Sequence, residues 1–233
     1  MVRIPGLPLS EYLPEPIPGR ETGVVLVGGD EVIAEGLRRA GYAVIRHVLD
    51  TGPLAQLAGL PFTPPVVAWP FPDAAFDAVI LLDMLALTVR EEEALAEAAR
   101  VLRPGGVLLL RVPGEGALAW LDGYNAYRYV RDISRRGRPL AATAGVGWRR
   151  HYRRDDLGGL LRPHFQVNDV RGVGLGLAEA TRLGLNLAFR WARQTESHDE
   201  AIETAAADVA RWEGGFSLAG RGYWLVAAAE RRS

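Results

Sequence analysis

Two side chains in this sequence are candidates for acid–base chemistry. His151 lies in a segment rich in arginine and aromatic residues, and a neutral imidazole accepts protons near neutral pH. Asp83 directly follows the apolar run Phe76–Leu82, so it stands at the end of a buried strand. We predict both residues as catalytic candidates. The alternatives are a capping or packing role for His151 and an ordinary loop position for Asp83.

The most unusual composition lies between Tyr124 and Arg154, where arginine and aromatic residues alternate. Guanidinium groups beside aromatic rings suit phosphates or stacked bases, so one interpretation is a nucleotide, RNA or phosphorylated substrate bound through Arg128–Arg154. The other is a solvated helix face followed by an arginine-rich loop. The residues concerned are Tyr124, Tyr127, Arg128, Tyr129, Arg131, Arg135, Arg136, Arg138, Trp148, Arg149, Arg150, His151, Tyr152, Arg153 and Arg154.

Composition sets the outer limits on function. The chain has 233 residues and 25.3 kDa, which suits one α/β domain with an elaborated substrate region. A net charge of −1 gives no general attraction to nucleic acid or to acidic membranes. The absence of cysteine and lysine excludes disulfides, thiolate metal sites and Schiff-base chemistry. No signal or membrane span is apparent, so we expect a cytoplasmic protein without a membrane partner.

No metal site is expected, because the other histidines lack the spacing of metal ligands. They are His47, His164 and His198.

The block Phe71–Pro113 organises the chain as strand, helix and strand. Thr88 with Glu91 three residues later predicts a capping box, and Arg103-Pro104-Gly105-Gly106 predicts the end of the helix. The buried strand Val107–Val112 follows. Short connections of this kind predict a parallel, right-handed crossover.

The same alternation runs through the rest of the chain. Residues 1–22 are rich in proline and glycine and predict an extended arm. The remaining expected elements are strands at Gly23–Val27, Tyr42–Leu49, Val66–Trp69, Phe165–Val170 and Tyr223–Ala228, and helices from Asp30 to Gly41, over Thr51–Leu60, over 116–135, from Arg153 to before Pro163, at Leu177–Arg193 and at Asp199–Trp212. The first half of the 177–212 segment is strongly apolar. The preferred interpretation is core packing or a substrate lid, and the second interpretation is a homodimer surface.

The runs FDAVILLDMLAL, AARVLRPGGVLLLRVP and WPFPDAAFDAV closely resemble class I S-adenosylmethionine-dependent methyltransferases, in particular small-molecule enzymes of the methyltransferase type 11 kind. The resemblance implies a doubly wound, Rossmann-like α/β sheet of seven strands with a helical insert before the last strand. That last strand would run antiparallel, beside the sixth. The resemblance also implies a single methyltransferase-like domain over residues 23–233, in which 114–152 and 173–220 are elaborations on the substrate side.

The resemblance also implies the methyl-donor site, at the turns after the strands. Where the family has acids, this chain has Val25, Val48 and Pro65, and its glycine turn reads Gly28-Gly29-Asp30. Asp50 could reach the ribose if the loop is reshaped. The residues implied to bind S-adenosylmethionine are Val27, Gly28, Gly29, Asp30, His47, Val48, Asp50, Val66, Leu82 and Asp83.

RHYRRDDL resembles the family's entry to its last crossover helix, which makes Arg150, His151 and Tyr152 substrate-side candidates. Tyr124, from the segment rich in arginine and aromatic residues, is a further substrate-side candidate. The predicted function is methyl transfer from S-adenosylmethionine to a small-molecule acceptor. A catalytically silent module, acting as a partner subunit or binding another ligand, is the alternative. An NAD-dependent oxidoreductase is excluded, since G-x-G-x-x-G is absent after the first strand. Asp83-Met84-Leu85-Ala86 also lacks the D/N-P-P-Y/F motif of base-amino methylases.

Overall fold

The structure is a computed structural model of the full chain. It describes residues 3–4, 6–28, 31–47, 68–87, 91–115, 119, 122, 149–191, 199–213 and 222–232. Within these residues the strands are β1 (Thr22–Val27), β2 (Tyr42–His47), β3 (Phe76–Leu82), β4 (Leu102–Pro113), β5 (Phe165–Val173) and β6 (Trp224–Arg231). The helices are α1 (Glu31–Arg39), α2 (Glu91–Val101), α4 (Arg154–Leu161), α5 (Leu177–Trp191) and α6 (Asp199–Glu213).

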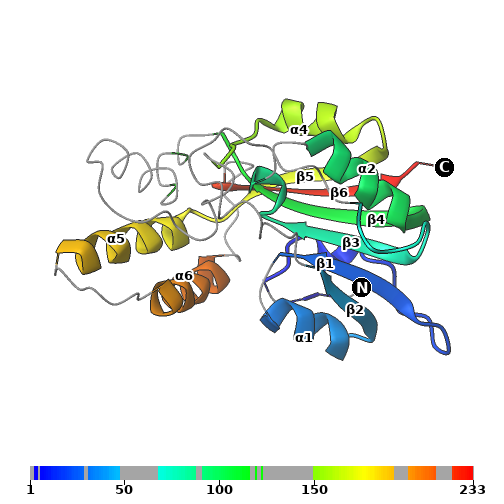
Figure 1. Ribbon diagram of the computed structural model, residues 1–233, viewed down its shortest axis with the longest axis horizontal. Helices are drawn as coiled ribbons and strands as arrows, with labels where there is room; N and C mark the ends of the chain where they lie inside the picture. The colour runs from blue at the N-terminus through cyan, green and yellow to red at the C-terminus, as the bar shows by residue number, and fades with distance from the viewer. Residues whose placement is uncertain are drawn as a thin grey trace.

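The strands form one sheet in the order β2-β1-β3-β4-β6-β5. The first four strands in this order are parallel to one another, whereas β6 is antiparallel to both β4 and β5 (Figure 1). The expected antiparallel last strand is therefore confirmed, as is the doubly wound α/β class. The seventh strand is not confirmed: the described part of Val66–Trp69, residues 68–69, is not in a strand.

β4 begins five residues earlier than the predicted strand Val107–Val112. Leu102 pairs with Phe76, and the next aligned pair along the ladder is Val107 with Ala78. The segment Arg103–Gly106, which we predicted as a helix stop, is thus an irregularity inside a strand. The helix still ends immediately before it, at Val101. Thr88 of the predicted capping box lies outside the described residues.

Alternating apolar side chains give the sheet two buried faces. On one face, Val79, Leu81 and Leu110 pack with the inner sides of α2 and α4. On the other, Val24, Leu26 and neighbouring side chains pack with α1. Figure 1 shows α2 and α4 on one side of the sheet and α1 on the opposite side.

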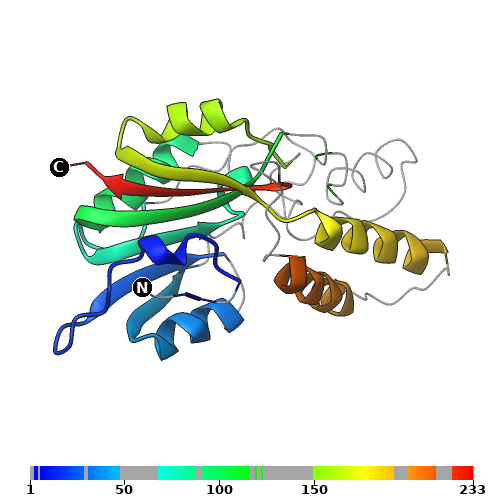
Figure 2. The same ribbon diagram turned by 180° about the vertical axis from the view of Figure 1, so that it is seen from behind.

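The N-terminal segment lies on the same side of the sheet as α1 and covers the part of that face that α1 leaves open (Figure 2). Its one 3-10 turn spans Ser10–Tyr12, and its buried apolar side chains are Ile4, Leu7, Leu9 and Leu13. The Tyr12 hydroxyl donates to Asp169 of β5 at 3.1 Å. We expected an extended arm because of its prolines; the described part packs as a layer of the fold, since alternating leucines and isoleucine give it an apolar side.

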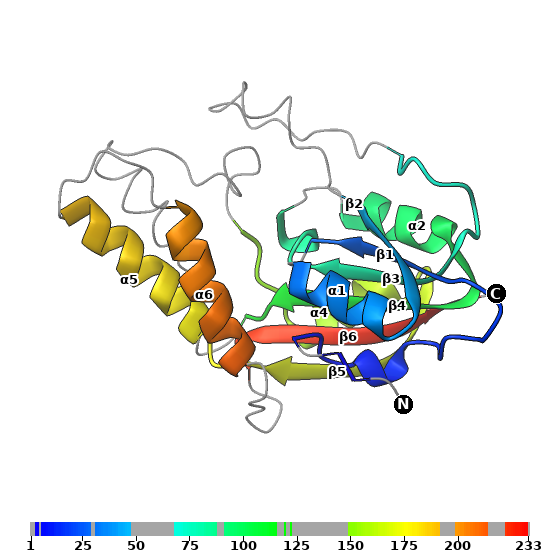
Figure 3. The ribbon, with the colours of Figure 1, turned by 90° about the horizontal axis from the view of Figure 1, so that it is seen from below.

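Helices α5 and α6 pack against each other as a hairpin that projects away from the sheet in all three views (Figures 1–3). Leu187 and Trp212 are exposed on it. The role of these side chains in a homodimer stays a prediction. No helix in the described part of the chain combines the length and apolar character needed to cross a membrane.

Candidate functional site

The parallel strands β1, β3 and β4 end at a common edge, which we call the carboxyl edge. Leu82 at the end of β3 is level with Arg111 near the end of β4. Because β6 is antiparallel, it begins where β4 ends, and Trp224 is paired with Pro113. The antiparallel strand therefore brings Tyr223 and Trp224 to the edge at which open α/β sheets bind ligands.

Gly28 lets the turn after β1 cross very close to the end of β3. Its φ is +77°, and a Cβ there would lie 2.1 Å from the Leu82 carbonyl oxygen and 2.9 Å from Met84 Cγ. Only glycine fits both the dihedral angle and the space. The side chains of Val27 and Leu82 are buried beneath this crossing. Glycine at this position therefore lets the turn after β1 pack directly against the end of β3 at the carboxyl edge.

His47 ends β2 beside two aromatic rings. Its ring centroid lies 5.5 Å from that of Trp69 and 5.4 Å from that of Phe71. Burial lowers the pKa of His47, which favours the neutral ring. The indole Nε1 of Trp69 is buried and has no hydrogen-bond partner within the described chain. This side of the carboxyl edge thus presents the partly exposed rings of His47 and Phe71, which suit stacking with the adenine of S-adenosylmethionine.

The other residues implied for the donor site cannot be placed. Gly29, Asp30, Val48, Asp50 and Val66 lie outside the described residues. The fit to the donor therefore depends on Gly28, His47 and Trp69, which are compatible with it.

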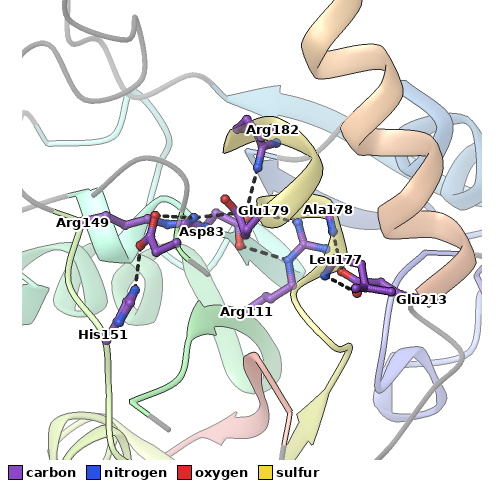
Figure 4. Close-up of polar contacts among 10 residues, drawn as sticks. Asp83, Arg111, Arg149, His151, Leu177, Ala178, Glu179, Arg182 and Glu213 are labelled. Atoms are coloured by element: carbon purple, nitrogen blue, oxygen red, sulfur yellow. Dashed lines mark hydrogen bonds and ion pairs between the residues drawn. The ribbon is translucent and has the colours of Figure 1, made fainter. Parts of the chain in front are cut away.

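Asp83 forms a two-point ion pair with Arg111. Oδ1 accepts from Arg111 Nε at 3.0 Å, and Oδ2 accepts from a terminal nitrogen at 2.6 Å (Figure 4). Asp83 has a φ of +66°, a conformation that aspartate tolerates better than most residues. Its backbone N–H also donates to the Arg111 carbonyl at 3.0 Å. Since both carboxylate oxygens are engaged, Asp83 in this arrangement fixes Arg111 at the carboxyl edge rather than offering a free base.

His151 is held by a buried acid that our sequence reasoning missed. His151 Nε2 lies 2.7 Å from Asp122 Oδ2. The Asp122 side chain is 2% exposed and that of His151 is 16% exposed. The available signal was an acid directly after the apolar run Ala119–Leu121, because an acid that packs with apolar neighbours needs a partner. The pair has the geometry of a histidine oriented by a carboxylate.

A second buried ion pair joins Arg149 to α5. Arg149 lies 3.3 Å from Glu179 Oε1, and Arg182 donates to the same oxygen at 2.7 Å (Figure 4). Burial is the largest single effect and opposes the charge of Arg149, but the surrounding groups, with Glu179 first among them, together outweigh it and raise the pKa of Arg149. The guanidinium carbons of Arg149 and Arg111 lie 4.7 Å and 4.9 Å from the Trp224 ring centroid. We call the six residues Asp83, Arg111, Asp122, Arg149, His151 and Glu179 the polar cluster.

Three of the substrate-side candidates, Arg150, His151 and Tyr152, are among the described residues, and of these only His151 belongs to the polar cluster. Arg150 instead contacts Glu91 at 2.6 Å, and the Tyr152 hydroxyl donates to the same carboxylate at 2.5 Å. The Tyr152 hydroxyl oxygen also lies 3.2 Å from the Leu85 carbonyl oxygen. The side chain is buried in the core beside α2, where burial and Glu91 raise its pKa. The two side chains thus fasten the segment after β4 to the first turn of α2. Tyr124 lies outside the described residues, as do most of the arginines considered for nucleic acid.

Comparisons with known proteins agree with this architecture. Residues 54–110 match the family model described as a methyltransferase domain. A S-adenosylmethionine-dependent methyltransferase from Methanosarcina mazei is 17% identical, with a TM-score of 0.51 over 95% of both chains. A sarcosine dimethylglycine methyltransferase candidate from Galdieria sulphuraria is 13% identical, with a TM-score of 0.51 over 91% of this chain and 79% of that one.

The [4+2]-cyclase SpnF has the same fold, with 18% identity and a TM-score of 0.50 over 95% of this chain and 79% of its own. No curated protein sequence matches the chain. These structures establish the fold, and the family match over 54–110 adds the sequence signature. Together they show a class I methyltransferase fold in which residues 54–110 match the methyltransferase-domain model.

Proposed function

We propose that the protein methylates a small-molecule acceptor whose reacting atom loses a proton, and that His151 accepts this proton. The observation that carries the proposal is the 2.7 Å contact between His151 Nε2 and the buried carboxylate of Asp122. In this role Asp122 is a positioning residue, since it acts through His151.

The contact sets the chemistry of the imidazole. A carboxylate on Nε2 favours the tautomer with the proton on that nitrogen, which leaves Nδ1 as the proton acceptor. Asp122 also stabilises the imidazolium that forms when Nδ1 takes up a proton. The His151 side chain is 16% exposed, so it is not closed off as completely as Asp122, at 2%.

The donor side of the proposal rests on the turn at Gly28 and on the aromatic surface at His47 and Trp69. S-adenosylmethionine supplies an electrophilic methyl group when bound there. Gly28 holds the turn after β1 against the end of β3, and the rings of His47 and Phe71 lie beside each other on the adjoining side of the carboxyl edge. We include Val27, Gly29, Asp30, Val48, Asp50, Val66 and Leu82 in the proposed lining.

The test has a binding step and a kinetic step. Calorimetric titration with S-adenosylhomocysteine should show binding by the wild-type protein; no binding at millimolar ligand would contradict the proposal. A panel of phenols and amines is then screened for formation of S-adenosylhomocysteine. With the best acceptor, His151→Asn should lower kcat by roughly 10²–10⁴-fold.

Asp122→Asn should lower kcat and shift the acidic limb of its pH profile, since the variant leaves the imidazole without its charged partner. His164→Asn is the matched control: His164 lies in the turn before β5 and contacts the Phe165 ring, outside the polar cluster. Equal activity of His151→Asn and His164→Asn would show that His151 is not the base.

A further inference from the structure

Buried charged side chains connect His151 to the first turn of α5. His151 Nε2 lies 2.7 Å from Asp122, and Arg149 Nη1 lies 3.9 Å from the other oxygen of that carboxylate. The same Arg149 nitrogen lies 3.3 Å from Glu179 Oε1, which Arg182 also contacts at 2.7 Å (Figure 4). Negative and positive groups therefore alternate from Asp122 to Arg182. The side chains of Asp122, Arg149 and Glu179 are only 2–3% exposed, so salt and water screen these interactions little.

Asp122 directs one carboxylate oxygen to each of two neighbours. Oδ2 is at hydrogen-bond distance from His151, whereas Oδ1 faces Arg149 at the longer distance of 3.9 Å. A guanidinium group can bind both oxygens of one carboxylate through two parallel hydrogen bonds. Arg149 and His151 therefore compete for Asp122, and in this structure His151 has the closer contact.

Glu179 is the closer of the two acids to Arg149, at 3.3 Å against 3.9 Å for Asp122. Asp83 is not an alternative partner, because Arg111 engages both of its carboxylate oxygens. Without the charge of Glu179, the buried Arg149 would depend on Asp122 for neutralisation, since an uncompensated buried charge is strongly unfavourable. Arg149 would then close the 3.9 Å gap and draw Asp122 away from His151.

The position of Glu179 is fixed by the packing at the base of the α5–α6 hairpin. Glu213 at the end of α6 accepts hydrogen bonds from backbone N–H groups at the start of α5, which carries Glu179 (Figure 4). Gly176, with a φ of +76°, lies against the Tyr223 ring, because a Cβ there would approach Tyr223 Cδ2 to 2.8 Å. The Tyr223 ring centroid is in turn 6.3 Å from that of His151. The start of α5 and the imidazole thus belong to one packed unit.

Other charged side chains near His151 within the described residues have partners of their own. Glu115 interacts electrostatically with the imidazole but forms an exposed ion pair with Arg153 at 2.8 Å. Arg150, the neighbour of His151 in the sequence, pairs with Glu91 at 2.6 Å. The balance between Asp122, Arg149 and Glu179 is therefore the interaction that bears directly on the imidazole.

We infer that Glu179 is a positioning residue for His151: by holding Arg149, it leaves Asp122 to the imidazole and so keeps the imidazole proton on Nε2. The base of the hairpin thereby determines which nitrogen of His151 accepts a proton. The inference rests on the proposed function for the use of that nitrogen in catalysis, whereas the position of the proton is a property of the protein alone.

The test is proton–nitrogen correlation NMR of the imidazole nitrogens in isotope-labelled protein at about pH 8, where an ordinary imidazole is neutral. The chain has four histidines, and His151→Asn assigns the His151 signals. The wild type should show a protonated Nε2 and an unprotonated Nδ1. Glu179→Gln should lower the ratio of the Nε2–H to the Nδ1–H tautomer about 3–10-fold, the effect of weakening one hydrogen bond. Asp208→Asn, which removes an exposed carboxylate of α6, should leave the ratio unchanged.

A second substitution separates this explanation from a general disturbance of α5. Arg149→Gln removes the competitor, so its addition to Glu179→Gln should restore the wild-type ratio. The double variant should also fold, since removal of both partners of a buried ion pair is tolerated better than removal of one. If Glu179→Gln alone does not fold, Glu179→Asp takes its place: it keeps the charge but shortens the side chain, and should lower the ratio by a smaller factor.

An unchanged ratio in Glu179→Gln, or in Glu179→Asp where that variant takes its place, would overturn the inference. A double variant with a ratio as low as that of Glu179→Gln would overturn it as well, because the effect would then not pass through Arg149. The spectra are recorded without S-adenosylmethionine. Failure to bind S-adenosylhomocysteine would therefore reject the proposed function alone, whereas an unchanged ratio with intact binding would reject only this inference.

Discussion

Glu213, the last residue of α6, caps Leu177, the first residue of α5: its carboxylate accepts the Leu177 N–H at 2.8 Å. The same side chain accepts from Leu175 N at 3.1 Å and Ala178 N at 3.4 Å. Three backbone donors at the start of one helix thus share an acid from the end of another. A negative charge is favourable there because the peptide dipoles point their positive end at it.

Replacing Glu213 should loosen the base of the hairpin. We expect Glu213→Gln to lower the free energy of unfolding by about 1–2 kcal/mol, since a charged acceptor is lost at a buried helix start. Native-state hydrogen exchange should accelerate at the amides of Leu177 and Ala178. Asp208→Asn is the control, an exposed acid on α6 that pairs with Arg211. Equal exchange rates in both variants would argue against the cap.

Gly28 and Gly19 have similar φ angles but differ in the room that each leaves for a Cβ atom. Both have positive φ, of +77° and +82°, but only at Gly28 would a Cβ meet other atoms. Gly19→Ala should therefore cost only the conformational penalty, about 1 kcal/mol. Gly28→Ala should cost about 2–4 kcal/mol and weaken S-adenosylhomocysteine binding at least tenfold. Denaturant unfolding and calorimetry provide the two readouts, and similar values for both variants would contradict the crowding at Leu82.

The Asp83–Arg111 pair can be examined with a double-mutant cycle. We expect Asp83→Asn and Arg111→Gln each to lower the free energy of unfolding by about 1.5–3 kcal/mol, because each leaves a partly buried charge without its partner. The double variant should be less destabilised than the sum of the two. An interaction energy of at least about 0.5 kcal/mol in urea unfolding would support the coupling; an additive result would show that the pair contributes nothing.

Glu97 should make the stability of the region before β3 pH-dependent. Arg100 and the Trp69 N–H donate to its carboxylate, and these hydrogen bonds lower its pKa from the ordinary value of 4.5. The folded protein therefore holds the ionised form more strongly than the unfolded chain does. This stabilisation is present above pH 4.5 and is lost as the pH falls through the lower folded value.

Accordingly, Glu97→Gln should be less stable than wild type at pH 7, with a difference that shrinks as the pH falls below 4.5. Urea unfolding of both proteins at several pH values measures this difference in the free energy of unfolding. Asp73→Asn is the control, because Asp73 contacts the same Arg100 but its side chain is 78% exposed. If the difference in free energy of unfolding between wild type and Glu97→Gln stayed constant with pH, this explanation would be contradicted.

The sheet was largely predictable because its strands are short apolar runs bounded by turn residues. Phe76–Leu82 was predicted with its observed bounds, and the antiparallel last strand was confirmed. These features depend on local patterns of hydrophobicity and on a family signature. The early start of β4 was not predictable in the same way, since Leu102 joins the sheet only through its long-range pairing with Phe76.

The polar cluster was only partly predictable. His151 and Asp83 attracted attention by residue type and position, but their partners Asp122 and Arg111 come from distant parts of the chain. Glu179 was not considered at all, because a glutamate in an amphipathic helix is ordinarily exposed. Pairings of this kind arise when separate elements pack, and no pattern within a single element specifies them.

The antiparallel direction of β6 has a consequence for the order of assembly. β6 lies between β4 and β5, so β5 leaves the ribosome before the strand that joins it to the rest of the sheet. Arg111 and Arg149 are likewise synthesised before Trp224, the ring that both guanidinium groups contact. During translation the nascent domain must therefore keep an incomplete sheet edge and two uncovered arginines until β6 emerges, and that interval is when chaperones would be most needed.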